Sequence, residues 1–420
     1  MAIIERNEKS SKTARRGRGW LAVWGPGLLV MLADTDAGCL ITAAQSGAQW
    51  GYTMVLPQLV LIPVLFMAQE MTVRLGIVTQ EGHGTLIRQY FGRGWAWLAA
   101  ATLGISAVGA LLTEFIGIAG VGELFGVSKW ITIPIATAFL VGIAFLGEYR
   151  RVEKIGVIVG LAEFAFVIAM VMAKPQLGDL MRGLVTVPWQ SSSYIYLVAA
   201  NVGAVIMPWM LFYQQGAVVD KHLTPADIPQ ERRDTAVGTL ITQAIMIVFI
   251  VTFAATVGKH GGSGAFATVG QMAGALAPYL GRLPAYLLIG TSLLGGSLVA
   301  ALVVALAGTW GLTEVLGWPH SLNEPFNRKS AGFYLIYIGA HVIGAVLVLA
   351  NIQLVDLAVT VEVINALLVP IVLGFLLLLE AKALPDKYRM HGWYRVIATT
   401  LCLLVMAFGL YMVGPMTHLW

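Results

Sequence analysis

The chain has 420 residues, of which 58% are hydrophobic and only 11% are charged, with a formal net charge of +4. Soluble domains carry about 25% charged residues, so this composition argues against a soluble enzyme, a disordered protein and a nucleic-acid binder. The two cysteines, Cys39 and Cys402, cannot form a disulfide framework, and no zinc-type Cys/His spacing occurs. We therefore predict an all-α polytopic membrane protein.

A helix needs about 20 apolar residues to cross a hydrocarbon layer about 30 Å thick. Residues 1–19 are polar and basic, so we treat them as a cytoplasmic tail, followed by a single transmembrane domain over 20–420. Eleven stretches qualify as membrane-spanning helices, in chain order: 25–46, 54–74, 97–124, 130–147, 155–173, 193–218, 236–257, 284–310, 331–350, 355–380 and 394–414.

The distribution of Lys and Arg predicts the orientation of these helices. With eleven spans, 21 of the 26 Lys and Arg residues fall on the N-terminal side of the membrane. Cytoplasmic loops carry an excess of Lys and Arg, so the N-terminus is predicted to be cytoplasmic. The other side has only Lys129, Lys174, Arg182, Lys259 and Arg282.

The first predicted helix contains two carboxylates near its middle, Asp34 and Asp36. An acidic side chain inside a membrane is costly and is by default a candidate site, although it can also be satisfied within the bundle as a structural group. Residues two apart do not share a helix face. Both acids can serve one site only if the backbone unwinds, which Gly38 would permit.

The sixth predicted helix contains Pro208, which removes a backbone donor and should free the carbonyl of Ala204. Pro208 is also compatible with an ordinary proline kink in a continuous helix. Because the two suspected breaks are five spans apart, they indicate an inverted-repeat transporter with repeats at about 25–173 and 193–380 and an extra helix at 394–414. An acidic site with no basic partner in the spans favours a cation.

Three segments then resemble the NRAMP family of divalent-metal transporters. The run from Gly25 to Tyr52 aligns with the family's first helix, so that its Asp-Pro-Gly-Asn motif falls on Asp36, Ala37, Gly38 and Cys39. Gln69 and residues 74–79 are similar to its second helix, and residues 204–208 to its sixth-helix metal motif. The resemblance implies a leucine-transporter-like 5+5 inverted repeat with broken helices 1 and 6, working by alternating access, in a bacterial plasma membrane.

The resemblance also implies a set of metal ligands. Asp36 would supply an oxygen, Met207 a thioether and Ala204 a carbonyl, and Cys39 stands at the position of the family's asparagine ligand. Three further departures are Trp209 in place of a histidine, Leu111 in place of an acid, and the additional acid Asp34.

The tenth predicted helix carries a further candidate ligand, Glu362, for which Asn365 or Asp356 could substitute. The sulfur ligands favour manganese or iron(II) over magnesium, whereas Asp34 would add hard oxygen and negative charge and suit a partly hydrated magnesium ion. A manganese- or iron-like ion and magnesium both remain candidates for the transported substrate. No cofactor is expected.

A proton path or gate is expected from Gln69, Glu114 and Trp209, with Glu163 as either a proton-path or a packing residue. Because Trp209 and Leu111 cannot titrate, we expect coupling to protons to be weak. Glu70 and Arg74 have the i, i+4 spacing of a gate or a surface ion pair. His341 is expected to be a hydrogen-bonded core residue.

The expected function is therefore secondary-active uptake of a divalent metal. A cation-coupled transporter of a small organic solute would need more polar side chains around Met207. An intramembrane metalloenzyme would need a ligand set such as HExxH, which the chain lacks, so we expect no enzyme activity.

Overall fold

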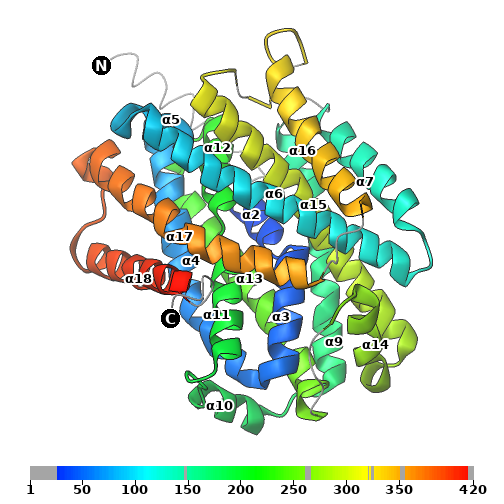
Figure 1. Cartoon of the computed structure of the whole chain (residues 1–420). Helices are drawn as coiled ribbons and strands as arrows, with labels where there is room; N and C mark the ends of the chain where they lie inside the picture. Colours follow the sequence, from blue (N-terminus) through cyan, green and yellow to red (C-terminus); the bar gives the residue numbers. More distant parts are fainter. Residues whose placement is uncertain are drawn as a thin grey trace, which may run out of the picture.

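The computed structural model describes residues 26–145, 149–260, 266–319, 321–322, 326–350 and 355–414, and these form helices with no strand among them (Figure 1). The predicted tail at 1–19 lies outside the described residues. Within them, nine helical stretches are long and apolar enough to cross a membrane, and Lys129–Ala144 is a shorter apolar helix. One of the nine, Ala37–Thr79, contains the second half of the first predicted span and the whole second span.

The eleven predicted spans therefore correspond to helices or broken helices. In order, they are α2 (Pro26–Asp34) with α3 (Ala37–Trp50), α4 (Val55–Thr79), α6 (Arg93–Leu124), α7 (Lys129–Ala144), α8 (Tyr149–Gly160) with α9 (Phe166–Ala173), α11 (Ser192–Val205) with α12 (Pro208–Asp220), α13 (Ile228–Ala255), α15 (Arg282–Leu316), α16 (Ala331–Leu349), α17 (Val355–Ala383) and α18 (Gly392–Tyr411). Three shorter helices connect them: α5 (His83–Phe91), α10 (Leu177–Val185) and α14 (Val269–Leu280).

Both predicted helix breaks are present. The first lies at Thr35 and Asp36, between α2 and α3, and the second at Ile206 and Met207, between α11 and α12. Met207 is extended, with φ −91° and ψ 138°, and Pro208 begins α12, where the missing N–H has no helical partner in any case. Gly38, which was predicted to permit the first break, lies inside α3, so that expectation was wrong.

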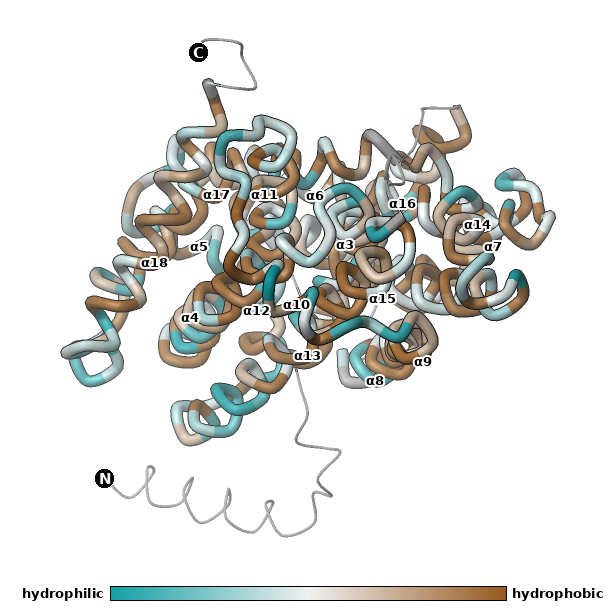
Figure 2. The backbone as a smooth tube through the Cα atoms, turned by 90° about the horizontal axis from the view of Figure 1, so that it is seen from below, coloured by the Kyte–Doolittle hydropathy of each residue, from teal (hydrophilic) through white to brown (hydrophobic). Residues whose placement is uncertain are grey.

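The broken helices lie inside the bundle. Residues of α2, α3, α11 and α12 are almost all buried, and α13 and α17 pack against them. The outer helices expose large apolar side chains, such as Ile135 on α7, Val171 on α9 and Leu335 on α16. Figure 2 shows hydrophobic residues along most of the helices. Apolar side chains on the outside and polar ones in the centre are the arrangement expected of a protein in lipid.

Glu70 and Arg74 are not a surface pair. They form a buried ion pair on α4 with an N–O distance of 3.0 Å. Arg74 also lies 3.5 Å from Glu380 of α17, and Tyr394 of α18 donates a hydrogen bond to Glu70 at 2.9 Å. This network joins three helices at one end of the bundle.

Candidate metal-binding site

The first helix break is stabilised by carboxylates. Asp36 caps α3, accepting a hydrogen bond from the backbone N–H of Cys39 at 2.7 Å. Glu114 of α6 accepts another from the N–H of Ala37 at 3.2 Å. The first N–H groups of a helix have no partner within the helix, so these two acids satisfy donors that would otherwise be unpaired in an apolar interior.

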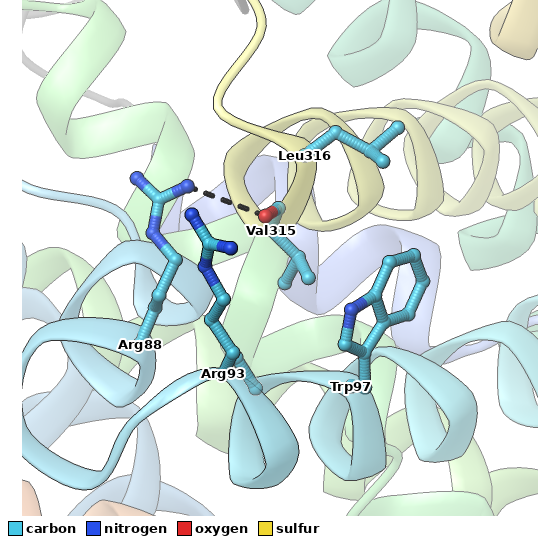
Figure 3. A pocket seen from close by; sticks show the side chains of 6 residues that line it. Arg88, Arg93, Trp97, Val315 and Leu316 are labelled. Carbon is cyan, nitrogen blue, oxygen red and sulfur yellow. Dashed lines mark hydrogen bonds between the residues drawn. The ribbon is translucent and has the colours of Figure 1, made fainter.

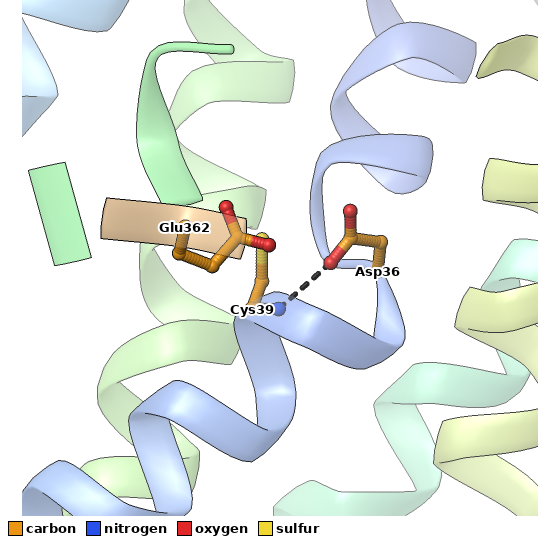
Figure 4. A group of neighbouring side chains, drawn as sticks. All are labelled: Asp36, Cys39 and Glu362. Atoms are coloured by element: carbon orange, nitrogen blue, oxygen red, sulfur yellow. Dashed lines mark hydrogen bonds between the residues drawn. The ribbon is translucent and has the colours of Figure 1, made fainter. Parts of the chain in front are cut away.

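Asp36, Cys39 and Glu362 form a cluster of possible metal ligands, which we call the ligand trio. All three are buried, and one ligand atom from each lies within 4.8 Å of the others. Figure 4 shows that Asp36 and Cys39 come from the start of α3 and that Glu362 approaches them from a separate helix, α17. Two carboxylates and a thiol are a donor set suited to a divalent cation of intermediate softness.

The second helix break contacts the ligand trio through a backbone carbonyl. The Cys39 thiol donates to the carbonyl oxygen of Ala204 at 3.1 Å. That carbonyl lies four residues before Pro208, which has no N–H to offer it. Ala204 thus lies next to the trio as the sequence predicts.

Met207 and Trp209 contact each other at the second break. The Trp209 indole N–H donates to the Met207 sulfur at 3.1 Å, and both side chains are fully buried. The predicted soft ligand is therefore held by an indole in this conformation. To bind a cation, the sulfur has to exchange this weak hydrogen bond for the metal.

Glu362 is held in place by a chain of polar groups that the sequence did not reveal. Asn365, one helical turn along α17, donates to the Glu362 carboxylate at 3.1 Å, and Ser106 of α6 donates to Asn365 at 2.8 Å. Asn365 thus contacts the Glu362 carboxylate directly. The side chain of Asp356, the other alternative, lies outside the described part of the structure.

Two glycines make room for Glu362. A Cβ added to Gly38 would overlap the Glu362 carboxylate, and one added to Gly203 on α11 would overlap the Glu362 backbone carbonyl. Both helices can therefore approach α17 closely at the level of the ligand trio.

Asp34, at the end of α2, lies on the other side of the break from Asp36. It is 1% exposed, and within the described residues neither of its carboxylate oxygens has a hydrogen-bond partner. The neighbouring Thr35 hydroxyl contacts Glu163, which also keeps one oxygen without a described partner. The sequence allows either a proton-path or a packing role for Glu163. The fold shows that its side chain lies beside the first helix break.

The remaining candidates are buried apart from the ligand trio. Gln69 on α4 is 1% exposed, and its amide oxygen has no partner among the described residues. His341 bonds the carbonyl of Tyr337 at 3.0 Å, as expected for a core histidine. His83 lies outside the eleven predicted spans, and it is buried in α5, where it bonds Gln215 at 2.8 Å.

Comparison with known proteins agrees with this architecture. Residues 27–414 match the family described as Natural resistance-associated macrophage protein-like. The chain belongs to this family. It is 27% identical over 307 residues to the divalent metal cation transporter MntH of Pectobacterium carotovorum strain PC1, covering 72% of this chain and 74% of the relative. It is also 27% identical over 307 residues to MntH of Klebsiella pneumoniae strain 342, covering 71% and 73%.

Solved structures show the same fold at low sequence identity. The Eremococcus coleocola manganese transporter superimposes with a TM-score of 0.76 at 17% identity, covering 94% of this chain and 87% of that one. Mhp1, a nucleobase-cation-symport-1 family transporter, superimposes with a TM-score of 0.61 at 14% identity, covering 93% and 89%. The chain is thus an integral membrane transporter with the leucine-transporter-like fold.

We expect Gly38→Ala to weaken metal binding while leaving the protein folded. The added methyl group would displace the Glu362 carboxylate, and disturbing groups that orient ligands costs about 10- to 100-fold in metal affinity. Isothermal titration with manganese measures the change. Gly104→Ala on α6 is the matched control, because a Cβ there meets nothing within 4 Å. Equal affinity in the two variants would show that Glu362 is not held against α3.

Proposed function

We propose that this protein takes up a divalent metal cation by alternating access, with manganese or iron(II) as the substrate. The observation that carries the proposal is the buried ligand trio at a helix break. Two carboxylates balance the charge of one divalent ion, and the Ala204 carbonyl beside Cys39 offers a further oxygen. The names of the MntH relatives and of the manganese transporter support the same class of substrate.

The choice of ion rests on the sulfur atoms near the break. Thiol and thioether ligands favour softer cations, whereas magnesium prefers oxygen and gives up its water reluctantly. Cys39 belongs to the ligand trio, and Met207 at the second break carries a further sulfur, which the Trp209 indole N–H contacts. We therefore place manganese and iron(II) ahead of magnesium.

Magnesium remains the second candidate because of the acids around the break. Asp34 and Glu163 are buried near Thr35, in addition to the two carboxylates of the trio. Such a wide acidic site could hold a cation that keeps part of its hydration shell.

We also infer a bacterial plasma-membrane location with the N-terminus in the cytoplasm, and a 5+5 repeat with halves at about 25–173 and 193–380. The bacterial origin of the relatives supports the location, and the asymmetry of Lys and Arg supports the orientation. The five-span separation of the two breaks supports the repeat.

Asp36→Ala should abolish metal uptake by proteoliposomes without unfolding the protein. It removes a charged ligand, so the loss should exceed tenfold. Because it also removes the cap of α3, the folded state of the variant is checked by size-exclusion chromatography. Asp179→Ala on α10 is the control, since its half-buried carboxylate pairs with the exposed Arg182 at 3.9 Å on a connecting helix. Near-normal manganese uptake by Asp36→Ala would falsify the site assignment.

Met207→Ala should lower uptake of manganese and cadmium relative to magnesium, because it removes a soft ligand and leaves the oxygens. The companion change Cys39→Asn should preserve or improve manganese uptake, since it replaces the thiol with an amide oxygen donor. The ratio of manganese to magnesium uptake in one vesicle preparation is the measurement. If this ratio does not move in Met207→Ala, Met207 only packs against Trp209.

Coupling to protons should be weak. Trp209 and Leu111 are buried and cannot exchange protons, and the ring of His341 is bonded to a backbone carbonyl. Vesicles loaded with a pH-sensitive dye should show manganese entry without internal acidification, driven by the ion gradient and the membrane potential. Acidification that follows metal entry, and is absent in Glu114→Gln, would contradict the inference and assign the proton to Glu114.

A further inference from the structure

A cavity of about 240 Å³ lies at one end of the bundle, away from the ligand trio. It is formed where the end of α5, the start of α6 and the end of α15 meet (Figure 3). Its lining combines charged, aromatic and aliphatic side chains: Arg88, Arg93, Ala96, Trp97, Val315 and Leu316. We call this cavity the arginine pocket.

The arginine pocket carries two positive charges without a matching acid. Arg88 donates to the Val315 carbonyl at 3.3 Å, which holds its guanidinium against the end of α15. Arg93 is exposed, and in the described part of the chain neither arginine forms an ion pair with a carboxylate. Figure 3 shows both arginines among the side chains that line the pocket. Two like charges in one pocket favour an anion there.

The surroundings of the pocket indicate that its mouth lies at the membrane surface. Trp95 and Trp97 are 55% and 51% exposed on the first turns of α6, and Leu98 beside them is 38% exposed. Tryptophans with this exposure at the end of a spanning helix are typical of the headgroup region. From there α6 continues as an apolar span, so acyl chains lie directly beside the pocket.

We propose that the arginine pocket binds the phosphate of an anionic phospholipid, such as phosphatidylglycerol, from the leaflet on the lysine- and arginine-rich side. Arg88 and Arg93 contact the phosphate oxygens, and Trp97 and Leu316 contact the glycerol and the first acyl carbons. An anionic lipid fits better than phosphatidylcholine because it brings no cationic group to compete with the arginines. A free phosphate would use the same charges but leave Trp97 and Leu316 without an apolar partner.

The test is native mass spectrometry of the full chain released from nanodiscs of phosphatidylcholine doped with phosphatidylglycerol. The wild type should retain phosphatidylglycerol. A basic residue near an anionic surface adds roughly 1 kcal/mol, so Arg93→Gln should weaken retention about fivefold and Arg88→Gln/Arg93→Gln about 25-fold. Arg93 makes no described contact, so the single variant should fold normally.

The control is Lys154→Gln/Arg328→Gln, which removes two exposed charges from the same side of the chain and should retain the lipid. The proposal would be overturned if Arg88→Gln/Arg93→Gln retained as much phosphatidylglycerol as this control. It would also be overturned if Arg93→Gln retained as much as the wild type. Retention of phosphatidylcholine equal to that of phosphatidylglycerol would also overturn it. Trp97→Ala should weaken lipid retention without affecting the binding of inorganic phosphate.

Discussion

The hydrogen bond from the Cys39 N–H to the Asp36 carboxylate is the interaction on which the centre of this protein depends. A helix broken inside lipid exposes backbone donors that no water can satisfy. Asp36 takes one of them at 2.7 Å, and Glu114 takes the N–H of Ala37 at 3.2 Å. Asp36, which would bind a cation, is therefore also one of the two groups that allow the backbone to unwind. Structural and binding roles coincide at this position.

The second helix break, between α11 and α12, contacts the first break through a backbone carbonyl. Pro208 leaves the Ala204 carbonyl without a helical donor, and the Cys39 thiol reaches it at 3.1 Å. The helices can meet here because Gly38 and Gly203 have no side chains to collide with Glu362. Small residues at such crossings are the usual means of bringing membrane helices together. Here they bring a third ligand, Glu362, to the two breaks.

The sequence predicts the spans and both breaks because each depends on local properties, namely apolar length, a proline and acids in an apolar run. It does not predict contacts between distant helices. The bond of Ser106 to Asn365 and the contact of Thr35 with Glu163 join residues whose proximity only the packed bundle creates. The buried His83 lies outside every predicted span because its helix, α5, is too short to register as one. Gly38 was assigned to the break, although its role is to admit a neighbouring carboxylate.

The geometry of the ligand trio links cation binding to helix movement. Without a cation, the carboxylates of Asp36 and Glu362 lie within 4.8 Å in a buried setting, where like charges repel by a few kcal/mol. A divalent ion replaces this repulsion with attraction to both, so it favours conformations in which α3 and α17 approach. A ligand shifts a conformational equilibrium only by its difference in affinity for the two states. Because Asp36 lies in the unwound pair of residues between α2 and α3, occupancy of the site can move α3 and α2 by different amounts. That difference is what alternating access requires.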